Sequence, residues 1–227
     1  NRPAHTGIIA NSWIDQSVTV GPKVVYCAED VSKRKAGSND YVASVGNLLV
    51  PTLGEWMKRA NPAARNIAVS GKDRGALMMG GHDIDQVYWW KGKGFATLEG
   101  RDIGAAAIAQ NAAITTMLAK GAPAFALSAW CGRNDRAVQV GAVTVGTGHF
   151  ALKSGDADGF RVSPRLDRAT LDLAVKLVDE QKLGKDAVPD VLSVSLSATD
   201  YVGHATGTEG AEMCIQLTQL DMALGDF

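Results

Sequence analysis

The apolar positions along the chain change repeatedly between two periods, that of a strand and that of a helix. Short alternating or uninterrupted apolar runs predict strands within 18–26, at 66–70, 86–90 and 95–98, and from 190 to about 196. Helical spacing or helix-forming composition predicts helices at 53–60, 75–80, 105–120 and 166–181, and a last helix beginning at 206–209. Strands that alternate with helices are typical of an α/β fold. We therefore expect a mainly parallel sheet with helices on both faces.

Residues at the ends of these segments carry the signals that begin and end helices and turns. Thr52, followed by Glu55 at the third helical position, predicts a capping box, and Asn61-Pro62 ends that helix. The sequence Lys-Gly-Lys-Gly at 91–94 predicts a hairpin between its two neighbouring strands. Residues 33–39 are polar and contain a glycine, which predicts a surface loop. In the two long helices near the end of the chain, we expect buried stripes of Leu171, Ala174, Val175 and Val178, and of Met213, Leu217, Leu220 and Leu224.

The segment 124–150 has no regular period and contains a polar cluster next to a tryptophan and a cysteine. It predicts an irregular, lid-like excursion, so we treat about 105–150 as an insertion or lid within a single domain. His149 has no partner nearby in the sequence and is expected to be structural or at the surface. The adjacent Trp89 and Trp90 either face a cleft or divide between core and surface.

Charge and apolar run length exclude several classes of function. The formal net charge of the 227 residues is −1, and no block of basic residues is present. Binding to nucleic acid or to an anionic membrane through a basic surface is therefore not expected. The longest apolar stretch is broken by glycine and polar residues before it reaches membrane-spanning length, so no span is expected in this chain.

The cysteines are Cys27, Cys131 and Cys214, and no pair has the spacing of a cysteine zinc site. They allow at most one disulfide within the chain, and we favour the interpretation that all three are small apolar fillers. The chain starts without Met and has no signal-like apolar core. We expect residues 1–227 to be an internal portion of a longer protein.

A carboxylate and an imidazole follow the strand predicted near 190–196. Asp200 and His204 are four positions apart, just after the place where that strand stops. Asp and His presented at the carboxyl end of a strand are a common way to build a metal site on an α/β sheet. The alternative, which the spacing alone leaves open, is an Asp at a helix start and a packed His. We expect Ser197, Thr199, Tyr201 and Gly203 to shape a loop around the pair and not to be ligands.

A second candidate site follows the strand predicted at 66–70. Lys72 and Arg74 are two cations at the carboxyl end of this strand, a pattern that suits a multiply charged anion, and Asp73 between them would orient one of them. The alternative is a solvated charged turn. Asn11 follows an apolar pair and can donate its amide to an anionic oxygen, although it can equally cap a turn.

Three ordered motifs resemble a known family. They are Thr-Gly-Ile-Ile-Ala-Asn-Ser-Trp at 6–13, Val-Ser-Gly-Lys-Asp-Arg at 69–74 and Leu-Ser-Ala-Thr-Asp-Tyr-Val-Gly-His at 196–204. They resemble the type I phosphodiesterase/nucleotide pyrophosphatase branch of the alkaline phosphatase superfamily. Within that branch, and with the segment 145–150 included, the chain looks most like bacterial periplasmic alkaline phosphatases with a threonine nucleophile, the Sphingomonas type.

The resemblance implies a role for each matching residue. Asp200 and His204 match two ligands of one zinc ion in a centre of two zinc ions. Asn11 matches a donor to an oxygen of the transferred phosphoryl group, and Lys72 and Arg74 match the pair that binds its remaining oxygens. The nucleophilic threonine and the remaining metal ligands of the family have no counterpart in this sequence. Because two ligands rarely make a tight zinc site, we expect this chain alone to be inactive.

The resemblance therefore implies that the whole protein is a zinc-dependent phosphomonoesterase that acts on small phosphate esters through a phospho-threonine intermediate. It also implies a periplasmic or secreted location. A phosphodiesterase or nucleotide pyrophosphatase is the alternative enzyme, and a non-catalytic phosphate-binding relative is the alternative of another class. A monoester dianion has one more charge than a diester, so a pair of cations favours monoesters.

Overall fold

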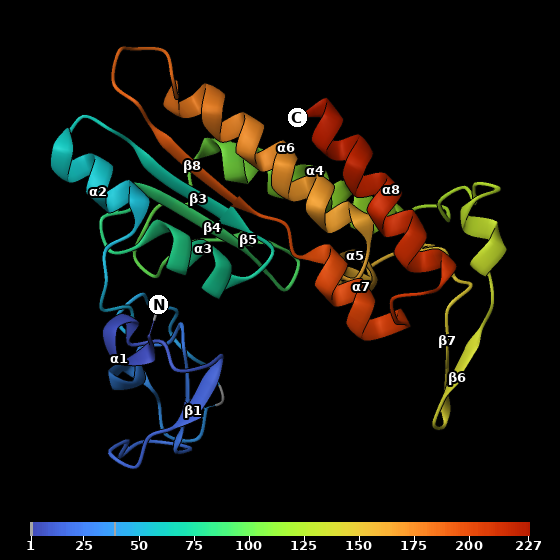
Figure 1. The fold of residues 1–227 in the computed structure, drawn as a ribbon, viewed down its shortest axis with the longest axis horizontal. Coiled ribbons are helices and arrows are strands. Elements are labelled where there is room, and N and C mark those ends of the chain that lie inside the picture. The colour runs from blue at the N-terminus through green and yellow to red at the C-terminus, as the bar shows by residue number, and fades with distance from the viewer. Residues whose placement is uncertain (1, 39) are drawn as a thin grey trace. The chain divides into compact units, whose positions relative to one another are not determined.

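The structure, a computed structural model, describes residues 2–38 and 40–227, and Figure 1 shows its fold. The described chain divides into two compact units. Unit 1 comprises the residues up to Trp89 together with 96–103 and 182–194. Unit 2 comprises 90–95, 104–181 and 195–227.

The principal sheet has four strands in the order β5-β4-β3-β8. The strands are β3 (Asn66–Ser70), β4 (Gln86–Lys91), β5 (Gly94–Ala96) and β8 (Val191–Ser195). β3 and β4 run parallel, with Ile67 opposite Gln86, and all five residues of β3 are buried. The predicted α/β fold with parallel strands is confirmed. The predicted hairpin is also present, because β4 and β5 are neighbours in the sheet.

Two helices pack against β3 within unit 1. α2 (Leu53–Ala60) has the predicted bounds and the predicted capping box: Thr52 Oγ1 accepts from the Glu55 N–H, and Glu55 Oε2 accepts from the Thr52 N–H at 2.8 Å. α3 (Asp73–Gly80) begins two residues earlier than predicted, directly after the turn that follows β3. Buried side chains of β3, β4, α3 and the segments around them form an apolar cluster of Cys27, Ala28, Ala68, Ala76, Leu77, Ile84, Val87 and Trp89.

The first part of unit 1 is less regular than its sequence pattern predicts. It contains α1 (Pro3–Thr6), β1 (Ser12–Ile14), β2 (Val24–Tyr26) and the 3-10 turn η1 (Val31–Lys33). β1 and β2 pair antiparallel. The strand predicted over 18–26 is therefore only β2, because the chain turns at Gly21, whose φ is +75°. The loop predicted over 33–39 is mostly exposed as far as Ser38, and Asn39 lies outside the described residues.

Unit 2 is built from helices that pack around α6 (Figure 1). They are α4 (Ala105–Lys120), α5 (Ala157–Arg161), α6 (Pro164–Gln181), α7 (Ala198–Thr206) and α8 (Ala211–Asp226). Phe160 of α5 is fully buried and stacks on Trp90, with ring centroids 5.0 Å apart. Trp89 and Trp90 are 4% and 7% exposed, so both expectations for this pair were wrong.

The predicted buried stripes of the last two long helices were only partly right. Leu171, Ala174 and Met213 are buried, whereas Val175, Leu217 and Leu224 are exposed and Val178 and Leu220 are half-buried. The predicted stripe fails in α8 because this helix has neighbours on several sides. It packs against α6, α7 and the turn η2 (Cys131–Asn134), so its buried positions do not follow one stripe. They include Ile215, Gln216 and Ala223 instead.

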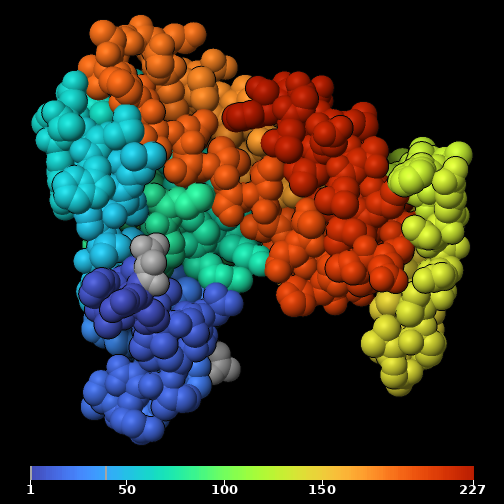
Figure 2. Space-filling view, in the orientation of Figure 1, coloured from blue at the N-terminus to red at the C-terminus, as the bar shows by residue number. Residues whose placement is uncertain are grey.

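The segment 124–150 contains η2 and a hairpin of β6 (Val138–Val140) and β7 (Val143–Val145), and Figure 2 shows it extending beyond α8. A disulfide joins Cys131 to Cys214 of α8, so the interpretation of all three cysteines as fillers was wrong. Cys27 is the buried free thiol that this interpretation expected. The cysteines of the disulfide are 83 residues apart, and no short-range spacing signal could have paired them. That 105–150 acts as an insertion or lid stays a prediction.

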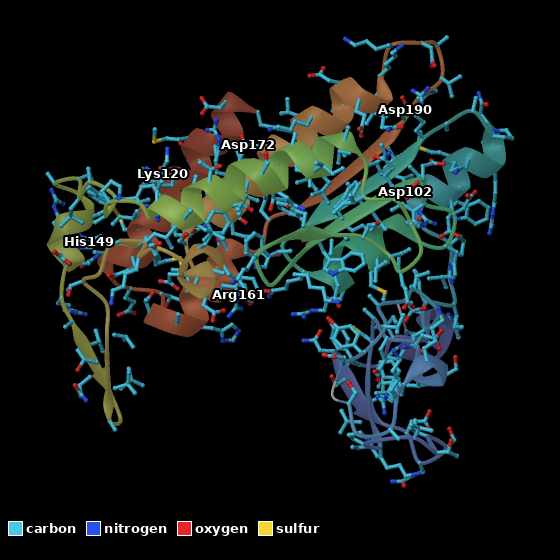
Figure 3. The ribbon with its side chains drawn as sticks, turned by 180° about the vertical axis from the view of Figure 1, so that it is seen from behind. Asp102, Lys120, His149, Arg161, Asp172 and Asp190 are labelled. Carbon is cyan, nitrogen blue, oxygen red and sulfur yellow. A yellow bond between two sulfur atoms is a disulfide. The ribbon has the colours of Figure 1, made fainter. Side chains whose placement is uncertain are left out.

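His149 makes structural contacts, which is one of the two expected outcomes, although its partners are distant in the sequence. Its Nε2 lies 2.9 Å from Asp135 Oδ1, and its backbone N–H donates to Glu212 Oε1. Figure 3 labels His149 on this segment. The histidine and the disulfide therefore both tie the segment to its surroundings in unit 2.

Candidate functional site

The junction between β3 and α3 positions the two cations of the anion-binding motif. β3 ends at Ser70, whose Oγ accepts a hydrogen bond from the backbone N–H of Lys72 at 3.0 Å. Lys72 is the N-cap of α3, and Arg74 lies in its first turn. Both side chains are half-buried. The helix start presents backbone N–H groups and the positive end of the helix dipole, so both cations lie where an anion is favoured.

Asp73, between the two cations, is buried and bound by two tyrosines. Its Oδ1 accepts from the Tyr26 hydroxyl at 2.6 Å, and its Oδ2 accepts from the Tyr41 hydroxyl. Arg74 Nη1 donates to the Tyr26 hydroxyl oxygen at 3.4 Å. Burial and the hydrogen bond to Asp73 raise the pKa of both tyrosines above their ordinary range. Burial disfavours the charge of Arg74, but the neighbouring Tyr26, Cys27 and Asp73 leave its pKa raised.

Sequence reasoning missed both tyrosines. Tyr26 precedes Asp73 by 47 residues and Tyr41 precedes it by 32, so no local spacing links them to the motif. The only available signal was indirect: a buried Asp needs hydrogen-bond donors, and tyrosine hydroxyls are suitable ones.

Asn11 lies at the start of the ladder that contains Tyr26. Its carbonyl oxygen accepts from the Cys27 N–H at 2.9 Å, and the next residue, Ser12, is paired with Tyr26. The Asn11 side chain is exposed. Asn11, Lys72 and Arg74 thus belong to unit 1, and Tyr26 connects their segments. One unit therefore carries an amide donor and two cations suited to anionic oxygens.

Asp200 and His204 lie in unit 2, on helix α7 rather than in a loop after the strand. His204 Nε2 is 3.5 Å from Asp200 Oδ1, and their side chains are 81% and 53% exposed. The two residues occupy one face of the helix because they are four positions apart. The sequence alternatives were a metal pair on a loop or a helix-start Asp with a packed His. The structure shows the helix but not the packed His.

The residues expected to shape a loop here belong to the start of the same helix. Ser197 is the N-cap of α7, and Thr199, Tyr201 and Gly203 lie within it, so the predicted loop was wrong. The helix can begin immediately after β8 because a buried carboxylate, Asp167 of α6, accepts from the N–H groups of Ser197 and Ala198. Arg161, labelled in Figure 3, lies 4.7 Å over the Tyr201 ring and packs α5 against this helix.

The chemistry of Asp200 and His204 fits part of a zinc site. A carboxylate oxygen and an imidazole nitrogen are both zinc ligands, and their separation would allow both to approach one ion. Among residues 2–38 and 40–227, no group of three or more His, Cys, Asp or Glu side chains could hold a metal ion. Further ligands would be required for a complete site.

A cleft of about 550 Å³ borders His204 in unit 2. One wall is formed by valines of the β6–β7 hairpin and Arg136, and the other by residues 203–210. The hairpin thus lies beside the helix end that carries His204. Within the described parts of the chain, no helix combines the length and apolarity needed to cross a membrane.

Comparison with known proteins identifies the family to which the chain belongs. Residues 1–227 match the type I phosphodiesterase/nucleotide pyrophosphatase family, and the chain belongs to this family. It is 48% identical to alkaline phosphatase PhoK of Sphingomonas sp, covering 100% of this chain and 41% of that protein. It is 46% identical to alkaline phosphatase PhoD of Zymomonas mobilis, covering 97% of this chain and 38% of that protein.

A solved structure supports the same fold. The crystal structure of wild-type alkaline phosphatase PafA matches with a TM-score of 0.80 at 24% identity, covering 99% of this chain and 46% of that one. The resemblance stated from the three sequence motifs is confirmed at the level of the family and fold. The chain spans about two fifths of the length of the two curated relatives above.

Proposed function

We propose that the protein containing this chain is a metal-dependent phosphomonoesterase of the alkaline phosphatase type. The observation that carries the proposal is the pair of half-buried cations, Lys72 and Arg74, at the start of α3. Family membership and the names of the relatives at 48% and 46% identity support it. The substrates are small phosphate esters.

In this proposal, unit 1 binds the phosphoryl group. Lys72 and Arg74 neutralise its non-bridging oxygens, and the Asn11 amide donates to one of them. Phosphoryl transfer depends mainly on positioning and electrostatic stabilisation, and these are the contributions that two fixed cations and an amide can make. The nucleophile is the threonine implied by the family resemblance, which lies outside this sequence.

Unit 2 contributes to metal binding in this proposal. The Asp200 carboxylate and the His204 imidazole would hold one of two zinc ions, with the other ligands outside this chain. Bound zinc supplies Lewis acidity and lowers the pKa of a coordinated hydroxyl. The two residues hold their positions through α7, whose start is fixed by Asp167.

The location we propose is periplasmic or otherwise outside the cytoplasm. The disulfide between Cys131 and Cys214 supports it, because such bonds persist in oxidising compartments and are rare in reducing ones.

The test is hydrolysis by the full-length protein. We expect nitrophenyl phosphate to be cleaved faster than a nitrophenyl nucleotide diester. Lys72→Ala and Arg74→Ala should each lower monoester kcat/KM by about 100-fold or more, since each removes a charge-assisted contact to the transition state. Lys93→Ala, in the exposed β4–β5 turn, is the matched control and should retain wild-type activity.

The phosphodiesterase alternative is favoured by the family description. It predicts the reverse substrate order and a smaller effect of losing either cation, because a diester has fewer charges to neutralise. A full-length protein that binds inorganic phosphate but hydrolyses neither substrate would instead support the non-catalytic alternative.

A further inference from the structure

The carboxylate of Asp73 is buried between the two proposed phosphate-binding cations, and its partners come from a distant segment. Asp73 is 6% exposed. An unpaired charge at this depth would be costly. The hydroxyls of Tyr26 and Tyr41 each donate to a different oxygen of the carboxylate. We call this arrangement of Tyr26, Asp73 and Tyr41 the tyrosine clamp.

Two hydrogen bonds join the clamp to Arg74. The Tyr26 hydroxyl donates to Asp73 and accepts from Arg74 Nη1, so a single oxygen links the guanidinium to the carboxylate. Asp73 Oδ1 also accepts from the Arg74 backbone N–H at 2.7 Å. A guanidinium donates in fixed directions, so a bond to one nitrogen restricts where the other donors point.

The segment that carries Tyr26 is itself fixed. Glu29 Oε1 accepts from the Tyr26 backbone N–H at 2.7 Å, and the Asn47 amide donates to the carbonyl oxygens of Tyr26, Cys27 and Glu29. Glu29 is 5% exposed and is paired with Arg34. The Tyr26 and Tyr41 rings also contact each other edge to face, with centroids 5.1 Å apart. The clamp therefore has a support independent of α3.

We propose that Tyr26 and Tyr41 are positioning residues, which together with Asp73 hold the Arg74 guanidinium in the orientation that binds phosphoryl oxygens. Tyr26 contacts the guanidinium directly, and Tyr41 acts through Asp73. This inference rests on the proposed function, because it assumes that Arg74 binds phosphate. The tyrosines do not touch the substrate in this account. Their role is to fix the donor geometry of Arg74 before substrate arrives, so that no reorganisation is needed in the transition state.

The chemistry of the two hydroxyls suits alkaline conditions. Burial and the bond to Asp73 raise the pKa of Tyr26 and of Tyr41. Both hydroxyls therefore remain protonated, and remain donors to Asp73, at pH values where an exposed tyrosine begins to ionise. The orientation of Arg74 is thus maintained as the pH rises.

The experiment uses the full-length protein with Tyr26→Phe and Tyr41→Phe, each in the wild-type and in the Arg74→Ala background. Phenylalanine retains the ring and removes only the hydroxyl. In the wild-type background we expect Tyr26→Phe to lower kcat/KM for nitrophenyl phosphate about tenfold and to weaken inhibition by inorganic phosphate by a similar factor. Tyr41→Phe should act in the same direction but less strongly, because the Tyr41 hydroxyl donates to Asp73, whereas the Tyr26 hydroxyl also accepts from the Arg74 guanidinium.

In the Arg74→Ala background, the same substitutions should change kcat/KM by less than about twofold, because residues that act through one another are not additive. Tyr88→Phe is the control. It removes a buried tyrosine hydroxyl of the same unit outside the clamp. We expect it to change kcat/KM by the same factor in both backgrounds.

Three outcomes separate this inference from the proposed function. If the Tyr→Phe substitutions lower kcat/KM by the same factor in the wild-type and Arg74→Ala backgrounds, the inference is overturned, because such losses would indicate a general structural role. Wild-type activity in both Tyr→Phe variants, with activity lost in Arg74→Ala, would also overturn it and leave the proposed function intact. An Arg74→Ala variant with wild-type activity would contradict the proposed function itself. If Tyr26→Phe unfolds at the assay temperature, Asp73→Asn in the two backgrounds supplies the same comparison.

Discussion

The carboxylate of Asp167 accepts a hydrogen bond from the backbone N–H of Ser197, with 2.8 Å between Oδ1 and N. The same oxygen accepts from the Ala198 N–H at 2.9 Å, and Oδ2 accepts from the Gln216 amide. Asp167 is 1% exposed and belongs to α6. It thus joins three helices at the N-terminus of α7, where a negative charge is favoured by the helix dipole. The position of Asp200 and His204 depends on this junction.

Replacing Asp167 by alanine should destabilise the protein by about 2–4 kcal/mol, because buried N–H groups lose a charged acceptor. Asp167→Asn retains an acceptor oxygen and should cost less. The measurement is the free energy of unfolding in urea. Asp179→Ala, an exposed position on the same helix, is the control and should change it by less than about 0.5 kcal/mol. Equal values for Asp167→Ala and Asp179→Ala would refute a supporting role for the junction.

Asp167 should also give the stability a pH dependence of known sign. Burial raises the pKa of its carboxyl in the folded protein, against the opposing hydrogen bonds from Ala198, Ser197 and Gln216. Between the pKa of this carboxyl in the unfolded chain, about 3.9, and its raised pKa in the folded protein, the folded state therefore binds more protons than the unfolded state. Its contribution to stability falls as the pH rises through this window.

The test is the difference in unfolding free energy between wild type and Asp167→Asn as a function of pH. This comparison cancels the contributions of the other carboxyl groups. We expect the difference in unfolding free energy between wild type and Asp167→Asn to shrink as the pH rises from about 3.5 to about 6. This range starts below the unfolded pKa of Asp, about 3.9. A wild-type advantage that grows with pH would mean that the hydrogen bonds outweigh burial.

The disulfide between Cys131 and Cys214 should contribute a large part of the stability of unit 2. It closes a loop between residues 83 positions apart, for which chain entropy predicts about 4.5 kcal/mol. We expect a reductant to lower the melting temperature of the wild type but not of a Cys131→Ser, Cys214→Ser double variant. Cys27→Ala, at the buried free thiol, should keep the response to reductant. An unchanged wild-type melting temperature on complete reduction would contradict the prediction.

Local signals predicted the elements whose ends are set by their own residues. α2 and β3 have the predicted bounds, because the capping box of Thr52 and the apolar run at 66–70 act within a few residues. α4 also has its predicted bounds, 105–120. The start of α7 was missed because it depends on Asp167, about 30 residues earlier in the chain, and no local pattern reports such a contact.

The same distinction applies to the candidate site. The motif around Lys72 and Arg74 is contiguous in sequence, and its place after β3 was predicted correctly. Its supporting residues, Tyr26 and Tyr41, come from segments whose meeting with Asp73 requires the tertiary fold. Sequence thus indicated the groups that would contact a ligand more readily than the groups that position them.

Removal of either proposed metal ligand should reduce the metal content of the full-length protein. His204→Ala and Asp200→Ala each delete one donor from an exposed pair, so neither should disturb the packing of α7. We expect each variant to lose about one zinc ion per chain by elemental analysis after dialysis, with a loss of monoester hydrolysis that added zinc partly restores. His5→Ala, an exposed histidine of unit 1, is the control and should retain the wild-type metal content. A His204→Ala variant with full zinc content and full activity would show that the α7 pair is not a metal site. In that case, the i, i+4 contact between His204 and Asp200 would be only a surface ion pair, of the kind that contributes little to stability.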